Sequence, residues 1–308
     1  MKQVLNPGIT TNTVSLIDHI VYSRVEDLQG NPLELDLSIM AAMGNSEMQA
    51  AMGWRRPAEI LPKKPCLVWF NGGGWRGVDK NGQLGELARF AKEGYVVACV
   101  YYRSSAQGHC PAQIIDCKTA IRFLRAHCEQ YCIDPDRIAV MGRSAGGHLS
   151  VMVGLNDDKY ISDEWAGYSS RVQAVVNMFG PTNVYAETKK HLEEEAAGRK
   201  IANRWNSALE THDGALLGGP RETLLERAKM YSPYWNLTES IAPTIILHGT
   251  ADPAVNHKHS EDLYDALCEL GKEEQTELYL IPGAAHGSPE FFQEETKDVI
   301  LRFLNKWV

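Results

Sequence analysis

The sequence predicts an α/β fold in which a mostly parallel sheet is covered by helices on both faces. Short apolar runs rich in Val, Ile and Tyr alternate with longer segments of helical periodicity along most of the chain. This alternation favours parallel strands that are joined by crossover helices. The runs Cys66–Phe70 and Val96–Val100 are continuously hydrophobic, which is typical of strands buried on both faces of a sheet.

Eight strands are expected, and the first two differ from the rest. They flank the turn-like cluster Gln29-Gly30-Asn31-Pro32, so we expect an N-terminal antiparallel hairpin. The eight expected strands are Ile17–Ser23, Leu33–Ile39, Cys66–Asn71, Tyr95–Tyr101, Ile138–Gly142, Val172–Met178, Thr244–His248 and Glu277–Ile281. The expected helices are Gly82–Glu93, Pro111–Tyr131, Ala145–Leu155, Lys258–Leu270 and Pro289–Trp307.

Two stretches, Ala41–Lys64 and Tyr185–Tyr234, are far longer than a usual connection between elements. We interpret them as insertions in a single domain over residues 1–308, at about 41–64 and 185–234, that cover the active-site side of the sheet. Met43, Met48 and Met52 lie in the first insertion. Either a mobile apolar flap over the pocket or plain packing fits this spacing.

Composition and charge exclude several classes of protein. With 308 residues, 44% of them hydrophobic, the chain can bury a large core without cross-links. The net charge is −8 and Lys and Arg form no extended block, so we expect no nucleic-acid partner. No apolar run approaches the length of a membrane span, and residues 1–15 show no signal peptide. We therefore expect a cytoplasmic protein without a membrane partner.

The seven cysteines lie mostly in apolar runs, as in Cys66-Leu67-Val68. An odd number does not suit a disulfide framework, and Cys128 and Cys132 lack a further Cys or His pair at zinc spacing. We expect reduced thiols that pack as small hydrophobic side chains, and no metal site.

The strongest chemical signal is Gly142-Arg143-Ser144-Ala145-Gly146, which lies directly between an expected strand and an expected helix. A G-x-S-x-G motif in this context presents a serine hydroxyl on a strained turn, with glycine two residues to either side to avoid collisions. The helix N-terminus also favours a developing oxyanion. We interpret Ser144 as a catalytic nucleophile; the alternative is a glycine-rich structural turn.

A second glycine motif, Asn71-Gly72-Gly73-Gly74-Trp75, follows the expected strand Cys66–Asn71. Three glycines allow the backbone to approach a ligand and to point N–H groups at it. A flexible hinge is the alternative. A phosphate-binding loop is disfavoured, because no Lys-Ser or Lys-Thr pair follows.

A serine nucleophile needs a base and an orienting carboxylate. Asp252 and His286 lie in the loops that follow the last two expected strands. The order Ser144, Asp252, His286 is that of α/β-hydrolase triads. All three residues follow the carboxyl ends of strands, where parallel sheets gather their sites. We therefore expect these residues to form a catalytic triad.

With these motifs the chain resembles the α/β-hydrolase esterases, most closely the feruloyl-esterase-like and acetyl-esterase-like group related to the hormone-sensitive lipases. The resemblance spans roughly residues 15–305 and rests on segments spread along the chain: Asn71–Trp75, Val100–Ser104, Pro111–Asp116, Ile133–Ile138, Ser144–His148, Leu217–Gly219, Ser232-Pro233 and His248–Val255. It implies that the backbone N–H groups of Gly73, Gly74 and Ala145 form an oxyanion hole. It also implies that no metal or organic cofactor is needed.

Asn71 and Arg143 depart from this group. Relatives usually have histidine at position 71, and an Asn amide can still hydrogen-bond the glycine loop, so we expect Asn71→His to be tolerated. Relatives commonly have an acidic residue or glutamine at position 143. We expect Arg143 to form a structural salt bridge, with attraction of an anionic substrate as the alternative. Arg103 and Asp116 are expected to form a structural ion pair, and Trp75 either stacks on a sugar or aryl group or walls the pocket.

The sequence therefore predicts a serine carboxylic-ester hydrolase with a small-molecule ester substrate. The mixed apolar and charged insertions suit a bounded pocket, so we expect short-acyl or aromatic-acyl esters, such as acetyl or feruloyl esters of plant-derived oligosaccharides. An amidase, either a formamidase or a small peptidase, would use the same triad. A non-catalytic ligand-binding homologue would keep the fold alone. The oligomeric state, including a homo-oligomer, is open.

Overall fold

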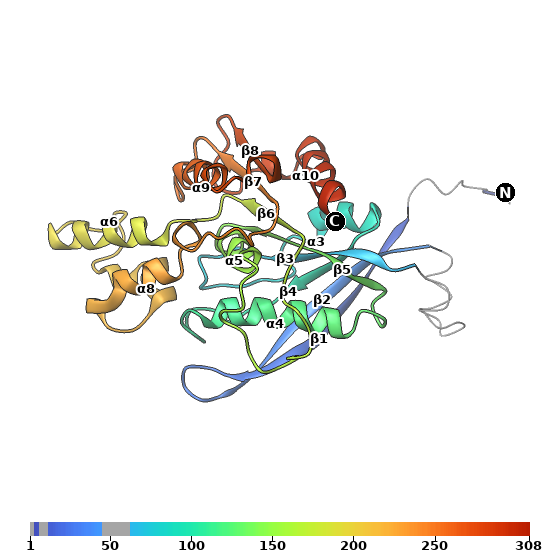
Figure 1. The fold of residues 1–308 in the computed structure, drawn as a ribbon, viewed down its shortest axis with the longest axis horizontal. Coiled ribbons are helices and arrows are strands. Elements are labelled where there is room, and N and C mark those ends of the chain that lie inside the picture. The colour runs from blue at the N-terminus through green and yellow to red at the C-terminus, as the bar shows by residue number, and fades with distance from the viewer. Residues whose placement is uncertain (1–2, 6–11, 45–61) are drawn as a thin grey trace.

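The computed structural model describes residues 3–5, 12–44 and 62–308, and these residues form an eight-stranded sheet with helices on both sides (Figure 1). The strand order is β1-β2-β4-β3-β5-β6-β7-β8, which confirms the fold class expected from the sequence. The strands are β1 (Thr13–Glu26), β2 (Pro32–Met43), β3 (Lys64–Phe70), β4 (Val96–Val100), β5 (Ile133–Arg143), β6 (Ala174–Met178), β7 (Thr244–Gly249) and β8 (Thr276–Ile281).

The N-terminal hairpin is antiparallel, as expected, and β1 forms one edge of the sheet. Its turn is closed by Asp27, whose Oδ1 accepts the backbone N–H of Gln29 at 2.8 Å and of Asn31 at 2.9 Å. Gly30 supplies the positive φ of 80° that the turn requires. β2 pairs antiparallel with β4, and the remaining strands, from β4 to β8 in the sheet order, are parallel.

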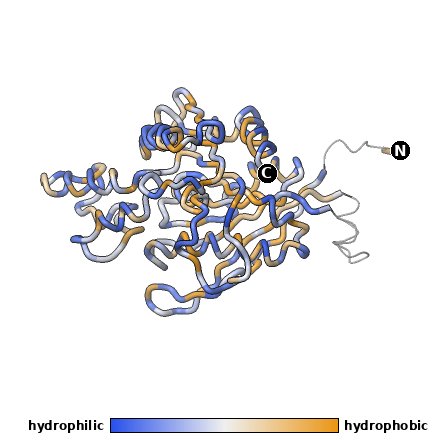
Figure 2. The backbone as a smooth tube through the Cα atoms, viewed as in Figure 1, coloured by the Kyte–Doolittle hydropathy of each residue, from blue (hydrophilic) through white to orange (hydrophobic). Residues whose placement is uncertain are grey.

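Alternate side chains of the central strands enter two separate cores. In β3, Val68 and Phe70 belong to the core that also contains residues of α4, α5 and α9. Leu67 and Trp69 belong to the core that contains residues of α3 and α10. All four side chains are fully buried, which explains why this strand is hydrophobic at every position. Figure 2 shows the same concentration of hydrophobic residues in the interior of the sheet.

The helices of the described ranges are α3 (Leu84–Lys92), α4 (Ala112–Ala126), α5 (Ala145–Gly154), α6 (Val184–Ala196), α7 (His212–Leu217), α8 (Leu224–Met230), α9 (Lys258–Glu269) and α10 (Glu294–Trp307). Short 3-10 turns occupy Ala208–Glu210, Arg221–Thr223, Pro233–Trp235, Glu273–Gln275 and Pro289–Phe292. None of the helices in this part of the chain has both the length and the apolar character needed to cross a membrane.

The expected helix Pro111–Tyr131 is too long at its C-terminal end. α4 ends at Ala126, because the chain must turn back and enter the sheet at Ile133, which pairs with Lys64 at the start of β3. Cys132 takes a positive φ of 55° at this reversal. β5 therefore begins before the expected start of that strand.

The expected helix Pro289–Trp307 is divided in the structure. Its first residues form a 3-10 turn, and Gln293 is extended, with φ of −67° and ψ of 156°. Such a residue cannot continue a helix, so α10 begins only at Glu294.

The segment 185–234 forms most of α6 and all of α7 and α8. It also contains the 3-10 turns Ala208–Glu210 and Arg221–Thr223 and the start of the turn Pro233–Trp235. α6 contacts α8, and the two lie together at one end of the molecule in Figure 1. Residues of this segment line the cavity that contains Ser144. The other long stretch, 41–64, lies mostly outside the described residues: β2 continues to Met43, and residues 45–61, with Met48 and Met52, are not described.

The seven cysteines form no disulfide with one another, and five of them are buried. Burial in the sheet raises the pKa of Cys66 and of Cys99 to about 12. Because the thiolate is the reactive form, these two side chains act as packing groups.

Candidate active site

Ser144 lies on a sharp turn between β5 and α5 and has φ of 51° and ψ of −123°. A Cβ built on Gly142 would lie 2.2 Å from the carbonyl oxygen of Gly146, and one built on Gly146 would lie 1.9 Å from the carbonyl oxygen of Phe70. Both positions therefore exclude any side chain, as the G-x-S-x-G pattern predicts. The packing of these glycines holds the serine in its strained conformation.

The structure brings Ser144, Asp252 and His286 together in one hydrogen-bonded line. Nε2 of His286 lies 2.9 Å from the Ser144 Oγ, and Nδ1 of His286 lies 2.7 Å from the Asp252 Oδ2. The three residues follow β5, β7 and β8 respectively, at the carboxyl ends of parallel strands. In this line the carboxylate holds the Nδ1 proton, which leaves Nε2 able to accept a proton from the serine.

The Asp252 carboxylate is fully buried and held from several sides. Its Oδ1 accepts the backbone N–H groups of Ala254 and Val255 at 2.8 and 2.9 Å. Burial alone would raise the pKa of this carboxyl group, but hydrogen bonds from His248 and His286 and from the Val255 backbone hold it well below its ordinary value. Asp252 therefore stays ionised.

His248 also belongs to this site, although the sequence alone predicted no role for it. Its Nε2 lies 3.3 Å from the Asp252 Oδ2 and 2.9 Å from the Val255 carbonyl oxygen, and its Nδ1 lies 2.6 Å from the Ser260 Oγ. The carbonyl and the carboxylate both require a donor, so the proton is on Nε2, and Nδ1 accepts from the serine hydroxyl. The only signal in the sequence is its place four residues before Asp252.

The glycine loop after β3 passes directly beside Ser144, because a Cβ built on Gly72 would lie 3.1 Å from the Ser144 Cβ. Gly73 and Gly74, with φ of 130° and 58°, line the cavity. Their N–H groups make no hydrogen bond in the described ranges. Ala145 is the first residue of α5, so its N–H has no intrahelical acceptor. These three donors are available to an oxyanion.

Trp75 follows the glycines and lines the cavity, but its side chain is only 4% exposed. Its ring packs edge-on against His148, with 5.2 Å between the ring centroids. So small an exposed surface favours Trp75 as a wall of the pocket over a role in stacking on a substrate.

Asn71 and Arg143, the two positions that depart from the resembled group, are bonded to each other. The Arg143 Nε donates to the Asn71 Oδ1 at 2.8 Å, and the same oxygen accepts the Gly72 N–H at 2.9 Å. The Asn71 Nδ2 donates to the Asp79 carbonyl at 2.5 Å. The salt bridge expected for Arg143 is not formed with any described residue. The expected pair of Arg103 and Asp116 is present, with 2.7 Å between Nη2 and Oδ1.

Replacing Asn71 should weaken the glycine loop. Asn71→Ala leaves the Gly72 N–H and the Arg143 Nε without their acceptor, a loss of about 1–3 kcal/mol, and we expect kcat/KM to fall roughly tenfold. The pH optimum should not move, because the His286–Asp252 pair is untouched. An imidazole nitrogen has one lone pair and can serve only one of the two donors. The tolerance expected for Asn71→His should therefore be partial, with activity between the wild type and Asn71→Ala. A shifted optimum in the pH–rate profile would contradict this role.

Ser144, His286 and the glycine loop line one cavity of about 610 Å³. Another part of its wall comes from the segment after β6 and from α9. There the Glu187 Oε1 lies 3.2 Å from Nε2 of His259, and Nδ1 of His191 lies 3.1 Å from the Asp213 Oδ1. The bond from His259 lowers the pKa of Glu187. Burial lowers the pKa of His191, but Asp213 raises it above its ordinary value. The sequence did not predict this polar wall, because its members are far apart in the chain.

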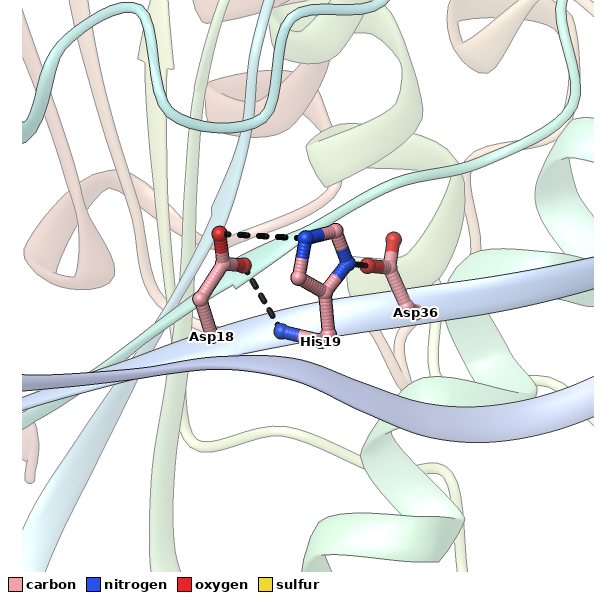
Figure 3. Close-up of side chains that lie close together, drawn as sticks. All are labelled: Asp18, His19 and Asp36. Atoms are coloured by element: carbon pink, nitrogen blue, oxygen red, sulfur yellow. Dashed lines mark hydrogen bonds and ion pairs between the residues drawn. The ribbon is translucent and has the colours of Figure 1, made fainter.

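A separate cluster of possible metal ligands, Asp18, His19 and Asp36, lies on the hairpin of β1 and β2 (Figure 3). Nδ1 of His19 lies 2.9 Å from the Asp36 Oδ2. The ammonium group of Lys80 lies 2.9 Å from Asp18 and 3.0 Å from Asp36, so a cation of the chain itself already bridges the two carboxylates. We interpret this cluster as an ion-pair network that attaches the loop after the glycines to the hairpin.

Comparisons of the sequence identify relatives of this chain. A family model described as BD-FAE matches residues 55–267. The chain is 30% identical to the probable carboxylic ester hydrolase LipM of Mycobacterium tuberculosis, over 71% of this chain and 49% of that protein. It is 28% identical to esterase LipC of the same organism, over 79% of this chain and 58% of that protein. The chain thus spans about half the length of the curated relatives it matches.

Solved structures match over nearly the whole chain. A truncated carbohydrate esterase from gut microbiota has a TM-score of 0.74 at 24% identity, over 97% of this chain and 98% of that one. Esterase 2 of Thermogutta terrifontis with propionate bound has a TM-score of 0.70 at 24% identity, over 97% and 96% of the two chains. These likenesses establish the fold. Because the family model covers more than half of the sequence, the chain belongs to the BD-FAE family of α/β-hydrolase esterases.

Proposed function

We propose that this chain is a serine carboxylic-ester hydrolase in which Ser144 is the nucleophile, His286 the general base and acid, and Asp252 the orienting carboxylate. The observation that carries the proposal is the continuous line of hydrogen bonds of 2.9 and 2.7 Å from the serine to the buried carboxylate. This line ends in a cavity that unpaired backbone N–H groups also line.

In the first half of the reaction the Ser144 Oγ attacks the ester carbonyl carbon while Nε2 of His286 takes the hydroxyl proton. The carbonyl oxygen becomes an oxyanion, which the N–H groups of Gly73, Gly74 and Ala145 stabilise. When the tetrahedral intermediate collapses, the bond to the alkoxy oxygen breaks. His286 returns its proton to that oxygen, the alcohol leaves, and the acyl group stays on Ser144.

In the second half a water molecule attacks the acyl carbon, and Nε2 of His286 takes a proton from it. The same N–H groups hold the second oxyanion. Its collapse breaks the bond to the Ser144 Oγ, which recovers its proton from His286 as the carboxylic acid departs. Asp252 remains ionised throughout, in accord with its lowered pKa.

The substrates we propose are short-acyl or aromatic-acyl esters, including acetyl or feruloyl esters of oligosaccharides. A cavity of about 610 Å³ holds a small acyl group together with part of an alcohol. Its polar wall suits a hydroxyl-rich alcohol more than a long alkyl chain. Among similar structures, Thermogutta terrifontis esterase 2 was solved with propionate and with butyrate, and another is a carbohydrate esterase from gut microbiota.

Hydrolysis should fall steeply between C2–C4 and C8 acyl chains, since a long alkyl chain would cover the polar and charged side chains of the cavity wall without replacing their hydrogen bonds to water. The test is kcat/KM for a panel of acetyl, butyryl, octanoyl, feruloyl and acetyl-sugar esters, with an anilide and a formyl amide beside them. Turnover that rises with chain length, or that increases sharply at an oil–water interface, would exclude the proposed substrates. Faster cleavage of the anilide or the formyl amide would favour an amidase.

A further inference from the structure

Arg143 has a position in the cavity that its hydrogen bond to Asn71 does not fully explain. The residue precedes the nucleophile, and its side chain lines the cavity. At one end the Nε is held by the Asn71 Oδ1 at 2.8 Å. The other end reaches the loop that carries His286, because a Cβ built on Gly287 would lie 3.8 Å from the Arg143 Nη1. The guanidinium therefore extends from the glycine loop to the histidine loop.

This guanidinium has no counterion among the residues that the structure describes. No carboxylate oxygen there lies within 4.0 Å of it, and Nη1 and Nη2 form no hydrogen bond. Neither of these nitrogens is sealed from solvent. Burial lowers the pKa of Arg143, so its charge has lost hydration without gaining an anion in return.

The other charged groups on the cavity wall already have partners. The Glu187 carboxylate lies 3.2 Å from His259 and 3.9 Å from Lys190. Asp213 lies 3.1 Å from His191, and the carboxylate of the triad holds its own histidines. The Lys190 side chain is also 62% exposed, so its charge keeps most of its hydration. Arg143 is thus the half-buried cation of this wall that lacks an anion.

We propose that Arg143 binds a carboxylate group carried by the ester substrate and so gives the enzyme a preference for anionic esters. The proposal rests on the proposed esterase function and names a substrate class for it. A guanidinium presents its two Nη groups as a planar fork that fits a carboxylate with two parallel hydrogen bonds. Fixing the Nε on Asn71 leaves that fork free and already oriented.

The amide at position 71 is part of this arrangement. Its oxygen has two lone pairs, and it uses them for the Gly72 N–H and the Arg143 Nε. An imidazole nitrogen, with one lone pair, could not hold both donors. The two residues that differ from the resembled group therefore act together. Asn71 holds the glycine loop through the Gly72 N–H, and the same oxygen positions the Arg143 guanidinium.

The test uses ester pairs that differ only in a carboxylate against a carboxamide. For the alcohol side the pair is 4-acetoxybenzoate and 4-acetoxybenzamide. For the acyl side the pair is monoethyl adipate and the ethyl ester of adipic monoamide. The readout is the ratio of kcat/KM for the anionic and the neutral member. We expect this ratio to favour the anion for the wild type in one of the pairs, which identifies the side that carries the charge. Arg143→Gln should lower that ratio by about tenfold or more.

Three variants separate this role from others. Arg143→Lys keeps the charge without the fork and should retain part of the preference. Lys190→Gln removes the other cation from the wall; if that variant loses the preference and Arg143→Gln does not, the assignment to Arg143 is wrong. Arg171→Gln removes one charge outside the cavity, from a half-exposed side chain 3.9 Å from Asp158, and should leave both ratios unchanged.

A binding measurement on the wild type tests the inference even if no ester is hydrolysed or the variants do not fold. Ligand-observed NMR on the wild type should show 4-hydroxybenzoate or adipate binding more tightly than the corresponding amide. If no ester in the panel is hydrolysed but the carboxylate binds, the proposed function fails and the anion site stands. If esters are hydrolysed but neither carboxylate is preferred, in binding or in turnover, the anion site is overturned and the esterase stands.

Discussion

Ser144→Ala should lower kcat for ester hydrolysis by about 10⁴-fold or more while the protein keeps its fold. The substitution removes the one oxygen that can attack the carbonyl, and the mechanism offers no second nucleophile in line with Nε2 of His286. It removes little packing, because the hydroxyl group faces the cavity. The strained turn is held by the two flanking glycines and stays as it is. The free energy of unfolding should therefore change by less than about 1 kcal/mol.

The measurement combines kcat for an acetate ester, thermal unfolding, and covalent labelling with a fluorophosphonate followed by mass spectrometry. The label should be on Ser144 in the wild type and absent from Ser144→Ala. Ser150→Ala is the matched control, since this serine lies in α5, the helix that follows Ser144, and donates to the Gly146 carbonyl at 2.9 Å, outside the cavity. It should be labelled normally. Near-wild-type turnover of Ser144→Ala would place the nucleophile elsewhere.

The strands and the sharp turn at Ser144 could be predicted from sequence because their signals are local. A continuous apolar run such as that of β4 reports burial on both faces by itself. Gly142 and Gly146 have no room for a side chain, and both lie within two residues of Ser144, so the motif by itself indicates the sharp turn. Asp252 and His286 could be placed because parallel strands end at one edge of a sheet, whatever their spacing in the chain.

The features that sequence did not predict depend on contacts between distant segments. α4 stops at Ala126 because β5 must pair with β3, and nothing within the helix itself signals that end. The Arg143 guanidinium was expected to meet an acid, but the partner within its reach is the Asn71 amide on another strand's loop. His248 supports Asp252 through a bend in the chain, and its place four residues before Asp252 is too weak a signal to predict that contact from sequence.

Asp252→Asn should be almost as damaging as loss of the nucleophile, with kcat lowered by about 10³–10⁴-fold. The reason is the direction of the hydrogen bonds around this carboxylate. Its Oδ1 accepts two backbone N–H groups, from Ala254 and Val255, so in the variant the amide oxygen must take that position. The amide nitrogen then faces Nδ1 of His286 and donates to it. The imidazole proton is forced onto Nε2, where it faces Ser144 and prevents the ring from acting as a base.

This argument predicts a spectroscopic change as well as a kinetic one. The proton on Nδ1 of His286, held 2.7 Å from the carboxylate oxygen in the wild type, should give a downfield proton resonance that disappears in Asp252→Asn. Asp116→Asn is the control for loss of a buried carboxylate: its Oδ1 lies 2.7 Å from Arg103, outside the cavity, so it should reduce stability but not kcat of the folded protein. If Asp252→Asn kept more than a tenth of the wild-type kcat, the histidine would not depend on this carboxylate for its tautomer, and Asp252 would act only as part of the loop's packing.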